Sequence, residues 1–251
     1  MKKPAYLTIF TIFFLIESSY SKPSEIDYFK TGAGLSTLLF SQYVYKKKND
    51  HFQNYKTENV NSFDSFFRSK IKWKENNLNK ANFYSDILLY GAALGSIPIS
   101  ASIIDGEYCE NILFLLNVLS VNGIITNFIK NISSRERPIY RHNSSRKKTN
   151  ESYKSFYSGH TSTVFAIGTS TSLLLSNQFP KSKNFIWLTT FSLASLTGYY
   201  RIASDNHYTT DVMFGALMGI TAGYLMYKEN IKHESKLSFT INSINYSYYI
   251  H

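Results

Sequence analysis

Five apolar segments follow one another between residues 86 and 227, and polar junctions separate them. They span residues 86–104, 111–129, 162–179, 185–200 and 212–227. Apolar runs of this length favour helices over strands. We therefore predict an all-α protein, a helical bundle of about five to six apolar helices.

The part of the chain between residues 22 and 85 is more polar. Residues 28–45 predict a first helix, closed by three lysines whose charges suit the C-terminal end of a helix dipole. Residues 49–81 are polar and basic, but Phe63, Phe66, Phe67, Ile71 and Trp73 recur there at roughly helical spacing. This spacing indicates either an amphipathic surface helix or a stripe that faces the core.

The two ends of the chain differ from the middle. Lys2 and Lys3, an apolar run over residues 5–16 and a polar stretch over residues 17–21 have the layout of a secretory signal. We expect either cleavage near Ser21 or retention of the segment as an uncleaved anchor. The tail over residues 236–249 alternates in places with period two, which predicts a short C-terminal β segment.

These patterns divide the chain into four parts. They are a signal peptide (1–21), an N-terminal helical region (22–84), a catalytic core (85–230) and a tail (231–251). We expect the functional site at one end of the bundle, where the polar junctions lie.

Charge and composition limit the chemical classes of partner that we expect. The 27 Lys and Arg against 17 Asp and Glu give a formal charge of +10, which suits phosphate or an anionic membrane, although ordinary surface solvation gives the same excess. The basic residues form no recognised nucleic-acid module, so we expect no nucleic-acid partner. Cys109 is the single cysteine, which excludes an intrachain disulfide and thiolate metal sites.

Three clusters at the helix junctions carry residues that handle a phosphate dianion. The first pairs Lys130 with Arg137, which Pro138 directs out of the helical conformation. Lysine supplies a point charge and arginine a bidentate fork. In the second, Ser158 is a candidate N-cap, Gly159 lets the backbone approach an anion, and His160 is placed to donate a proton.

The third cluster contains Arg201, His207 and Asp211. If a helix begins near residue 206, His207 and Asp211 lie four residues apart on one face. The carboxylate would then bond one imidazole nitrogen and leave the other free to attack phosphorus.

Together the clusters resemble the signature of the type-2 phosphatidic acid phosphatase and vanadium haloperoxidase superfamily, over about residues 85–227. The resemblance implies that His207 is the nucleophile, oriented by Asp211, and that His160 is the general acid and later the base. It implies a phosphate cradle, no metal and no cofactor. The cradle residues would be Lys130, Arg137, Ser158, Gly159 and Arg201. Two positions depart from the family: Tyr157 replaces the usual Pro and Tyr200 the usual Ser.

The expected function is hydrolysis of a phosphate monoester or diphosphate, with a lipid phosphate as the leading substrate, through a phosphohistidine. A soluble periplasmic acid phosphatase of broad specificity and a non-catalytic binder of phosphate head groups are the alternatives. We expect an exported site, in a protein that is either membrane-embedded or soluble in the periplasm. If a cleaved signal leaves Lys22 outside and residues 86–104 and 111–129 both cross a membrane, residues 31–45 should lie along its surface.

Overall fold

The structure is a computed structural model that describes residues 25–47, 60–104, 108–143 and 145–248. Within these ranges it contains helices and no strand, so the predicted all-α class is confirmed. Its α-helices are α2 (Glu25–Lys47), α3 (Ser62–Ile71), α4 (Leu78–Tyr90), α5 (Ile97–Ile103), α6 (Tyr108–Ser133), α7 (Pro138–Arg141), α8 (Gly159–Gln178), α9 (Lys183–Ala203) and α10 (Thr209–Tyr248). The N-terminal 21 residues, where we expect a signal, lie outside the described residues.

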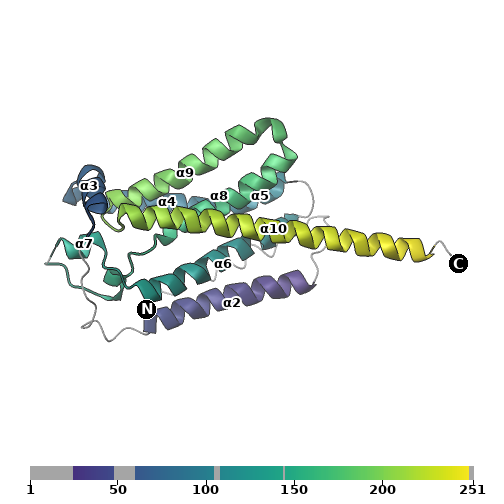
Figure 1. Cartoon of the computed structure of the whole chain (residues 1–251), viewed down its shortest axis with the longest axis horizontal. Helices are drawn as coiled ribbons and strands as arrows, with labels where there is room; N and C mark the ends of the chain where they lie inside the picture. The colour runs from purple at the N-terminus through teal and green to yellow at the C-terminus, as the bar shows by residue number, and fades with distance from the viewer. Residues whose placement is uncertain (1–24, 48–59, 105–107, 144, 249–251) are drawn as a thin grey trace.

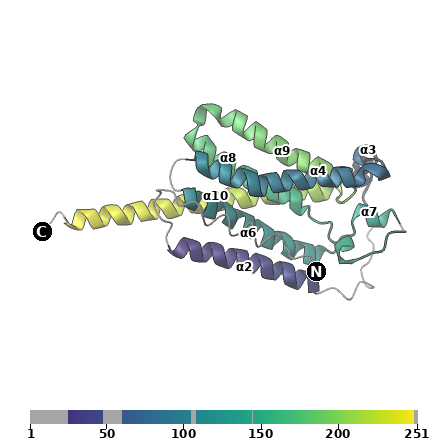
Figure 2. The ribbon, with the colours of Figure 1, turned by 180° about the vertical axis from the view of Figure 1, so that it is seen from behind.

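The long helices form a bundle, and α3, α7 and the longer loops gather at one end of it (Figure 1). Each of the five apolar segments contributes to a helix of the bundle. The first begins earlier than expected, at Leu78, and its middle is a π-helical stretch over Gly91–Ser96 that joins α4 to α5. Seen from behind, α4 and α5 lie along the outside of the bundle (Figure 2).

The prediction of a C-terminal β segment is wrong. The backbone remains helical through Tyr248, and α10 extends past the end of the bundle opposite α3 (Figure 1). Two physical reasons account for this difference. No Pro or Gly follows Gly223 to stop the helix, and a single alternating segment gains little as a strand without a partner strand.

Close contact between α8 and α10 sets the geometry of the core. Gly215, Gly219 and Gly223 recur every four residues along one face of α10 and lie against the backbone of α8. A Cβ atom at Gly215 would lie 2.7 Å from the Ser158 carbonyl oxygen, so a larger residue would push the two helices apart. The stripe therefore fixes the start of α10 directly beside the start of α8.

The helix α2 lies along α6 and runs in the same direction. Gly34 approaches Ser120, and further along both helices Ser41 accepts a hydrogen bond from Asn127 at 2.8 Å. Both helices thus end at the α3 end of the bundle. If α6 crosses a membrane, α2 crosses with it, which contradicts the expectation that residues 31–45 lie along the surface.

The outer surface of the bundle is unusually apolar. Two helical stretches, Glu75–Ile103 and Tyr108–Arg141, are long and apolar enough to cross a membrane, and only 17% of the apolar window of the first is buried inside the protein. Exposed large apolar side chains on α4, α9 and α10 include Phe83, Ile87, Phe185, Leu188, Leu217 and Leu225. Soluble monomers rarely expose so much apolar surface, so this pattern is typical of helices that face lipid.

Candidate active site

The three predicted clusters meet at the α3 end of the bundle. Both α6 and α9 end there, which places Lys130 and Arg201 beside each other, while α8 and α10 begin there. The loop after α6 carries Arg137, and the short loop between α9 and α10 carries His207. All the predicted site residues therefore lie in one region, although they are up to 81 positions apart (130 to 211) in the sequence.

His207 lies in the loop before α10 and is 2% exposed. Its Nδ1 atom lies 2.7 Å from the carbonyl oxygen of Ser155. A carbonyl oxygen can only accept a hydrogen bond, so this contact assigns the proton to Nδ1 and leaves Nε2 with its lone pair. The geometry presents a neutral imidazole whose Nε2 is available as a nucleophile.

The structure shows no direct hydrogen bond between His207 and Asp211, although the sequence analysis expects one. The helix begins at Thr209 rather than near residue 206, so the two residues do not share a helix face. The Asp211 Oδ2 atom is 3.8 Å from His207 Nδ1, and the Ser155 carbonyl takes the closer position. Asp211 instead reaches back to the start of its own helix, where Oδ2 accepts a hydrogen bond from the backbone N–H of Tyr208 at 2.8 Å. Free N–H groups at a helix start attract an acidic side chain in this way.

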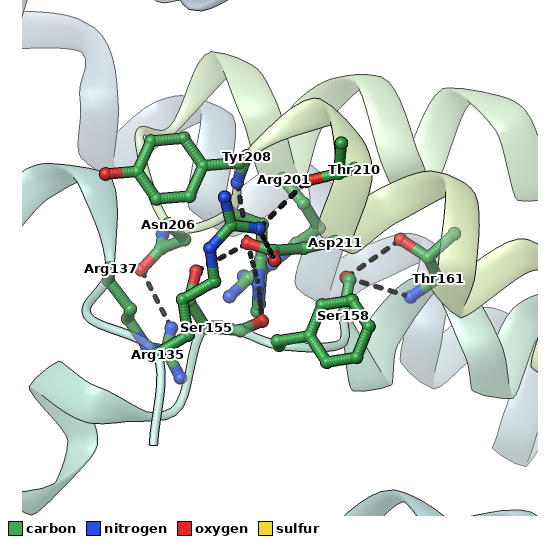
Figure 3. A network of polar contacts seen from close by, with 12 residues as sticks. Arg135, Arg137, Ser155, Ser158, Thr161, Arg201, Asn206, Tyr208, Thr210 and Asp211 are labelled. Atoms are coloured by element: carbon green, nitrogen blue, oxygen red, sulfur yellow. Dashed lines mark hydrogen bonds and ion pairs between the residues drawn. The ribbon is translucent and has the colours of Figure 1, made fainter. Parts of the chain in front are cut away.

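A residue that the sequence analysis missed, Arg135, holds Asp211 from the other side. Its Nη1 atom lies 2.5 Å from Asp211 Oδ1, and its Nη2 atom lies 2.7 Å from Oδ2 of Asp64 on α3. Both carboxylates are fully buried. Figure 3 shows Arg135 in contact with Asp211 and Thr210. Ser155 completes this network, since its hydroxyl donates to Asp211 at 2.5 Å while its carbonyl holds His207.

Two of the three predicted cations, Arg201 and Arg137, are held by hydrogen bonds. Arg201 is 3% exposed, and its Nη1 atom donates to Asn82 at 2.7 Å and to Ser85 at 3.1 Å, both on α4. Arg201 Nε is buried and has no hydrogen-bond partner among the described residues. Arg137 donates from Nη1 to Asn206 at 3.1 Å (Figure 3). An unpaired buried donor beside two further cations is a natural contact for an anion.

These charges act directly on the nucleophile candidate. Burial, together with the positive charges of Arg201, Arg137 and Lys130, holds the pKa of His207 well below its usual value of 6.5. His207 is therefore neutral at physiological pH. This protonation state agrees with the tautomer that the Ser155 carbonyl selects.

The start of α8 has the predicted cap. Ser158 is the N-cap, and its side chain accepts from the backbone N–H of Thr161. The backbone at Gly159 passes so close to α6 that a Cβ there would lie 3.3 Å from Lys130 Nζ. The absence of a side chain at Gly159 thus lets the lysine ammonium reach the helix N-terminus, where backbone N–H groups also favour an anion.

His160 has a partner that the sequence analysis missed. Its Nε2 atom lies 2.8 Å from Oδ1 of Asp86 on α4. One signal in the sequence points to this carboxylate: it is the acidic residue of an otherwise apolar helical segment, residues 86–104. Ionisable residues in such segments are expensive to bury and are usually functional.

The two departures from the expected motif are both accommodated by packing. Tyr157, in the place of the usual Pro, is 1% exposed, and its hydroxyl lies 3.1 Å from Thr126 on α6. Tyr200, in the place of the usual Ser, stacks edge-on against Trp73 at 5.8 Å between ring centroids. Within the described residues, no group of three or more His, Cys, Asp and Glu side chains is arranged to hold a metal ion.

A family model described as the PAP2 superfamily matches residues 111–233. Among curated relatives, the lipid A 4'-phosphatase of Porphyromonas gingivalis is 30% identical over 119 residues, which cover 45% of this chain and 48% of that protein. The lipid A 1-phosphatase of the same organism is 37% identical over 73 residues, which cover 29% of this chain and 16% of that protein. The chain thus spans about half or less of the length of these relatives.

Two solved structures share the fold. One is a transmembrane PAP2-type phosphatidylglycerolphosphate phosphatase from Bacillus subtilis, with a TM-score of 0.55 and 18% identity, covering 79% of this chain and 96% of that chain. The other is LpxE from Aquifex aeolicus, with a TM-score of 0.50 and 24% identity, covering 68% of this chain and 98% of that chain. At these identities the two structures support only the similarity of the fold.

Proposed function

Because the chain belongs to the PAP2 superfamily through residues 111–233, we propose that it is a phosphatase that hydrolyses a phosphate ester through a phosphohistidine on His207. The observation that carries this proposal is the position of one neutral, buried histidine among three cations, with a second histidine nearby. Binding of phosphate alone needs the cations but not a nucleophile and an acid. The non-catalytic alternative therefore leaves both histidines without a role.

The nucleophilic step follows from the tautomer. The Ser155 carbonyl keeps the proton on Nδ1, so Nε2 attacks phosphorus and the ester oxygen leaves on the opposite side. Asp211 does not orient the ring directly in this proposal. It fixes Ser155, whose carbonyl then orients His207.

The cations stabilise the charge that grows during the attack. Negative charge builds on the equatorial oxygens of the transferring phosphoryl group, and donors that are already in place stabilise it without reorganisation. Arg201 offers its unpartnered Nε, and Lys130 lies beside the N-terminus of α8. His160 protonates the leaving oxygen and then activates the water that hydrolyses the phosphohistidine.

A lipid phosphate is the substrate class that the surface favours. The site lies at one end of a bundle whose outer faces expose large apolar side chains, and the curated relatives are named lipid A phosphatases. A lipid head group at a membrane surface could reach such a site while its chains stay in the bilayer. A small soluble ester is the alternative substrate.

Phosphate release from matched lipid and water-soluble esters, with EDTA in excess, tests the proposed function. The purified protein should release phosphate from both classes, faster from the lipid, and vanadate should inhibit it because it mimics the pentacoordinate phosphoryl group in the cradle. Loss of activity with EDTA and its recovery with a divalent metal would point to a metallophosphatase instead. Absence of release from every ester, with retained vanadate binding, would favour the head-group binder.

We further propose that the bundle is embedded in a membrane with its site end on the exported side. Since α2 ends at the site end, its first residue, Glu25, would then lie on the cytoplasmic side. A cleaved signal that leaves Lys22 outside is incompatible with this arrangement. In a soluble exported protein, by contrast, the whole surface would be outside.

Cys109 gives a direct test of this orientation. It is partly exposed at the start of α6, and the 21 residues to Lys130 place it about 30 Å from the site end. A membrane-impermeant maleimide should therefore label Cys109 only after cells are permeabilised. The matched control is Ser145→Cys in a Cys109→Ser background, because Ser145 is exposed in the loop at the site end and should be labelled in intact cells. The reverse pattern would place the site in the cytoplasm.

A further inference from the structure

The two histidines of the site have partners of different chemistry. His207 Nδ1 lies 2.7 Å from a backbone carbonyl, whereas His160 Nε2 lies 2.8 Å from the carboxylate of Asp86. A carbonyl selects a tautomer of neutral imidazole without adding a charge. A carboxylate also favours the charged imidazolium, because an opposite charge at this distance stabilises it. The partners thus suit His207 to attack and His160 to give up a proton.

The groups that face the His160 ring come from four elements. They are Asp86 of α4, Lys130 of α6, Arg201 of α9 and His207 in the loop before α10. Burial disfavours a proton on His160, and the positive charges of Arg201 and Lys130 act in the same direction. In the described part of the chain, Asp86 is the one negative charge in this set. The cations that would hold a phosphate therefore disfavour protonation of His160, the proposed general acid. The Asp86 carboxylate opposes this effect.

Asp86 is held in place by its own helix and by the cradle. Its Oδ2 atom accepts a hydrogen bond from Asn82 Nδ2 at 2.9 Å, one turn earlier on α4. Its Oδ1 atom, which faces His160, also lies 3.9 Å from Arg201 Nη1. Asn82 in turn accepts from Arg201 at 2.7 Å. The carboxylate is thus fixed between the acid and a cation, on a helix outside the residues 111–233 that the family model matches.

We propose that Asp86 is a positioning residue that holds the Nε2 proton of His160 and keeps the ring ready to donate from its other nitrogen. This inference rests on the proposed function. As the bond between phosphorus and the ester oxygen breaks, the His160 imidazolium passes its Nδ1 proton to the leaving oxygen and becomes neutral. The Nε2 proton stays in the bond to Asp86. The neutral ring then takes a proton at Nδ1 from the water whose oxygen attacks the phosphohistidine.

The substitution Asp86→Asn tests this role, because it removes the charge at nearly constant shape. The alkoxide of an alkyl or lipid phosphate is a poor leaving group and needs the proton, whereas the aryloxide of an aryl phosphate does not. We expect kcat on an alkyl phosphate to fall by about tenfold or more, within the range that general acid catalysis contributes. The kcat on an aryl phosphate should stay within about threefold of the wild type. Asp86→Glu, which keeps the charge, should recover part of the alkyl activity.

Two comparisons separate this role from a structural one. Glu75→Gln changes an exposed carboxylate that pairs with Lys72, and it should leave both activities unchanged. In a His160→Ala background, Asp86→Asn should cause no further loss, since Asp86 acts through the ring. An equal loss on aryl and alkyl esters, or an additive loss in the double variant, would overturn the inference.

The same data distinguish failure of the inference from failure of the proposed function. A wild-type protein that releases no phosphate from any ester would contradict both. A His160→Ala variant with the expected leaving-group dependence, beside an Asp86→Asn variant without it, would overturn the role of Asp86 and leave the proposed function standing.

Discussion

Replacing His207 with alanine is expected to abolish phosphate release, with a fall in kcat on the order of 10⁴-fold or more, as for nucleophiles that act within a catalytic unit. The reason is that the covalent step has no substitute: His160, the other histidine of the site, is bound through Nε2 to Asp86. The loss should be equal on aryl and alkyl phosphates, because a better leaving group does not replace the attacking atom. Steady-state kinetics on a paired aryl and alkyl ester measure this.

Retention of the fold has to be shown for the same variant. His207→Ala removes one side-chain hydrogen bond, to the Ser155 carbonyl, but leaves the network of Asp211 and Arg135 in place. The variant should therefore still bind inorganic phosphate through the cations and unfold in a single transition near that of the wild type. His142→Ala is the matched control, since His142 is exposed in the loop after α7. Phosphate release at the wild-type rate from folded His207→Ala would refute the mechanism.

The substitution Arg135→Met should strongly destabilise the protein. It leaves the buried carboxylates of Asp64 and Asp211 without their cation. Removing one partner of a buried ion pair typically costs about 3–5 kcal/mol, because the remaining charge stays uncompensated. The free energy of unfolding in detergent should fall by about this amount. Activity should fall as well, because Asp211 fixes Ser155, which orients His207.

Arg141→Met provides the comparison for this prediction. Arg141 is as exposed as Arg135 but pairs with a single carboxylate, Glu136, at 3.8 Å, and Lys148 also contacts that carboxylate. Its loss should cost much less. If Arg135→Met were as stable and active as Arg141→Met, the ion pairs of Arg135 would have no part in holding the loop that carries His207.

The sequence by itself determined the features that depend on neighbouring residues. The length of the apolar runs predicted the helices, because a helix forms from local hydrogen bonds and needs one continuous apolar face. The N-cap at Ser158 was predictable for the same reason, since a cap uses a side chain and backbone groups only three residues apart. The motif spacing of Lys130, Arg137 and Arg201 also predicted which residues gather, because each lies at or beside a helix end at the same end of the bundle.

Only the tertiary structure decided which partners those residues have. A spacing of four residues predicted a bond between His207 and Asp211, but the helix begins two residues after His207. A carbonyl 52 positions away in sequence accepts the hydrogen bond from Nδ1 instead. The carboxylate of Asp86 meets His160 across 74 positions, and the cation of Arg135 meets Asp64 across 71. The parallel direction of α2 and α6 also depends on contacts between residues that are far apart in the sequence. Such contacts depend on how helices pack, and the packing is set by close approaches such as Gly215 on Ser158, which no local pattern encodes.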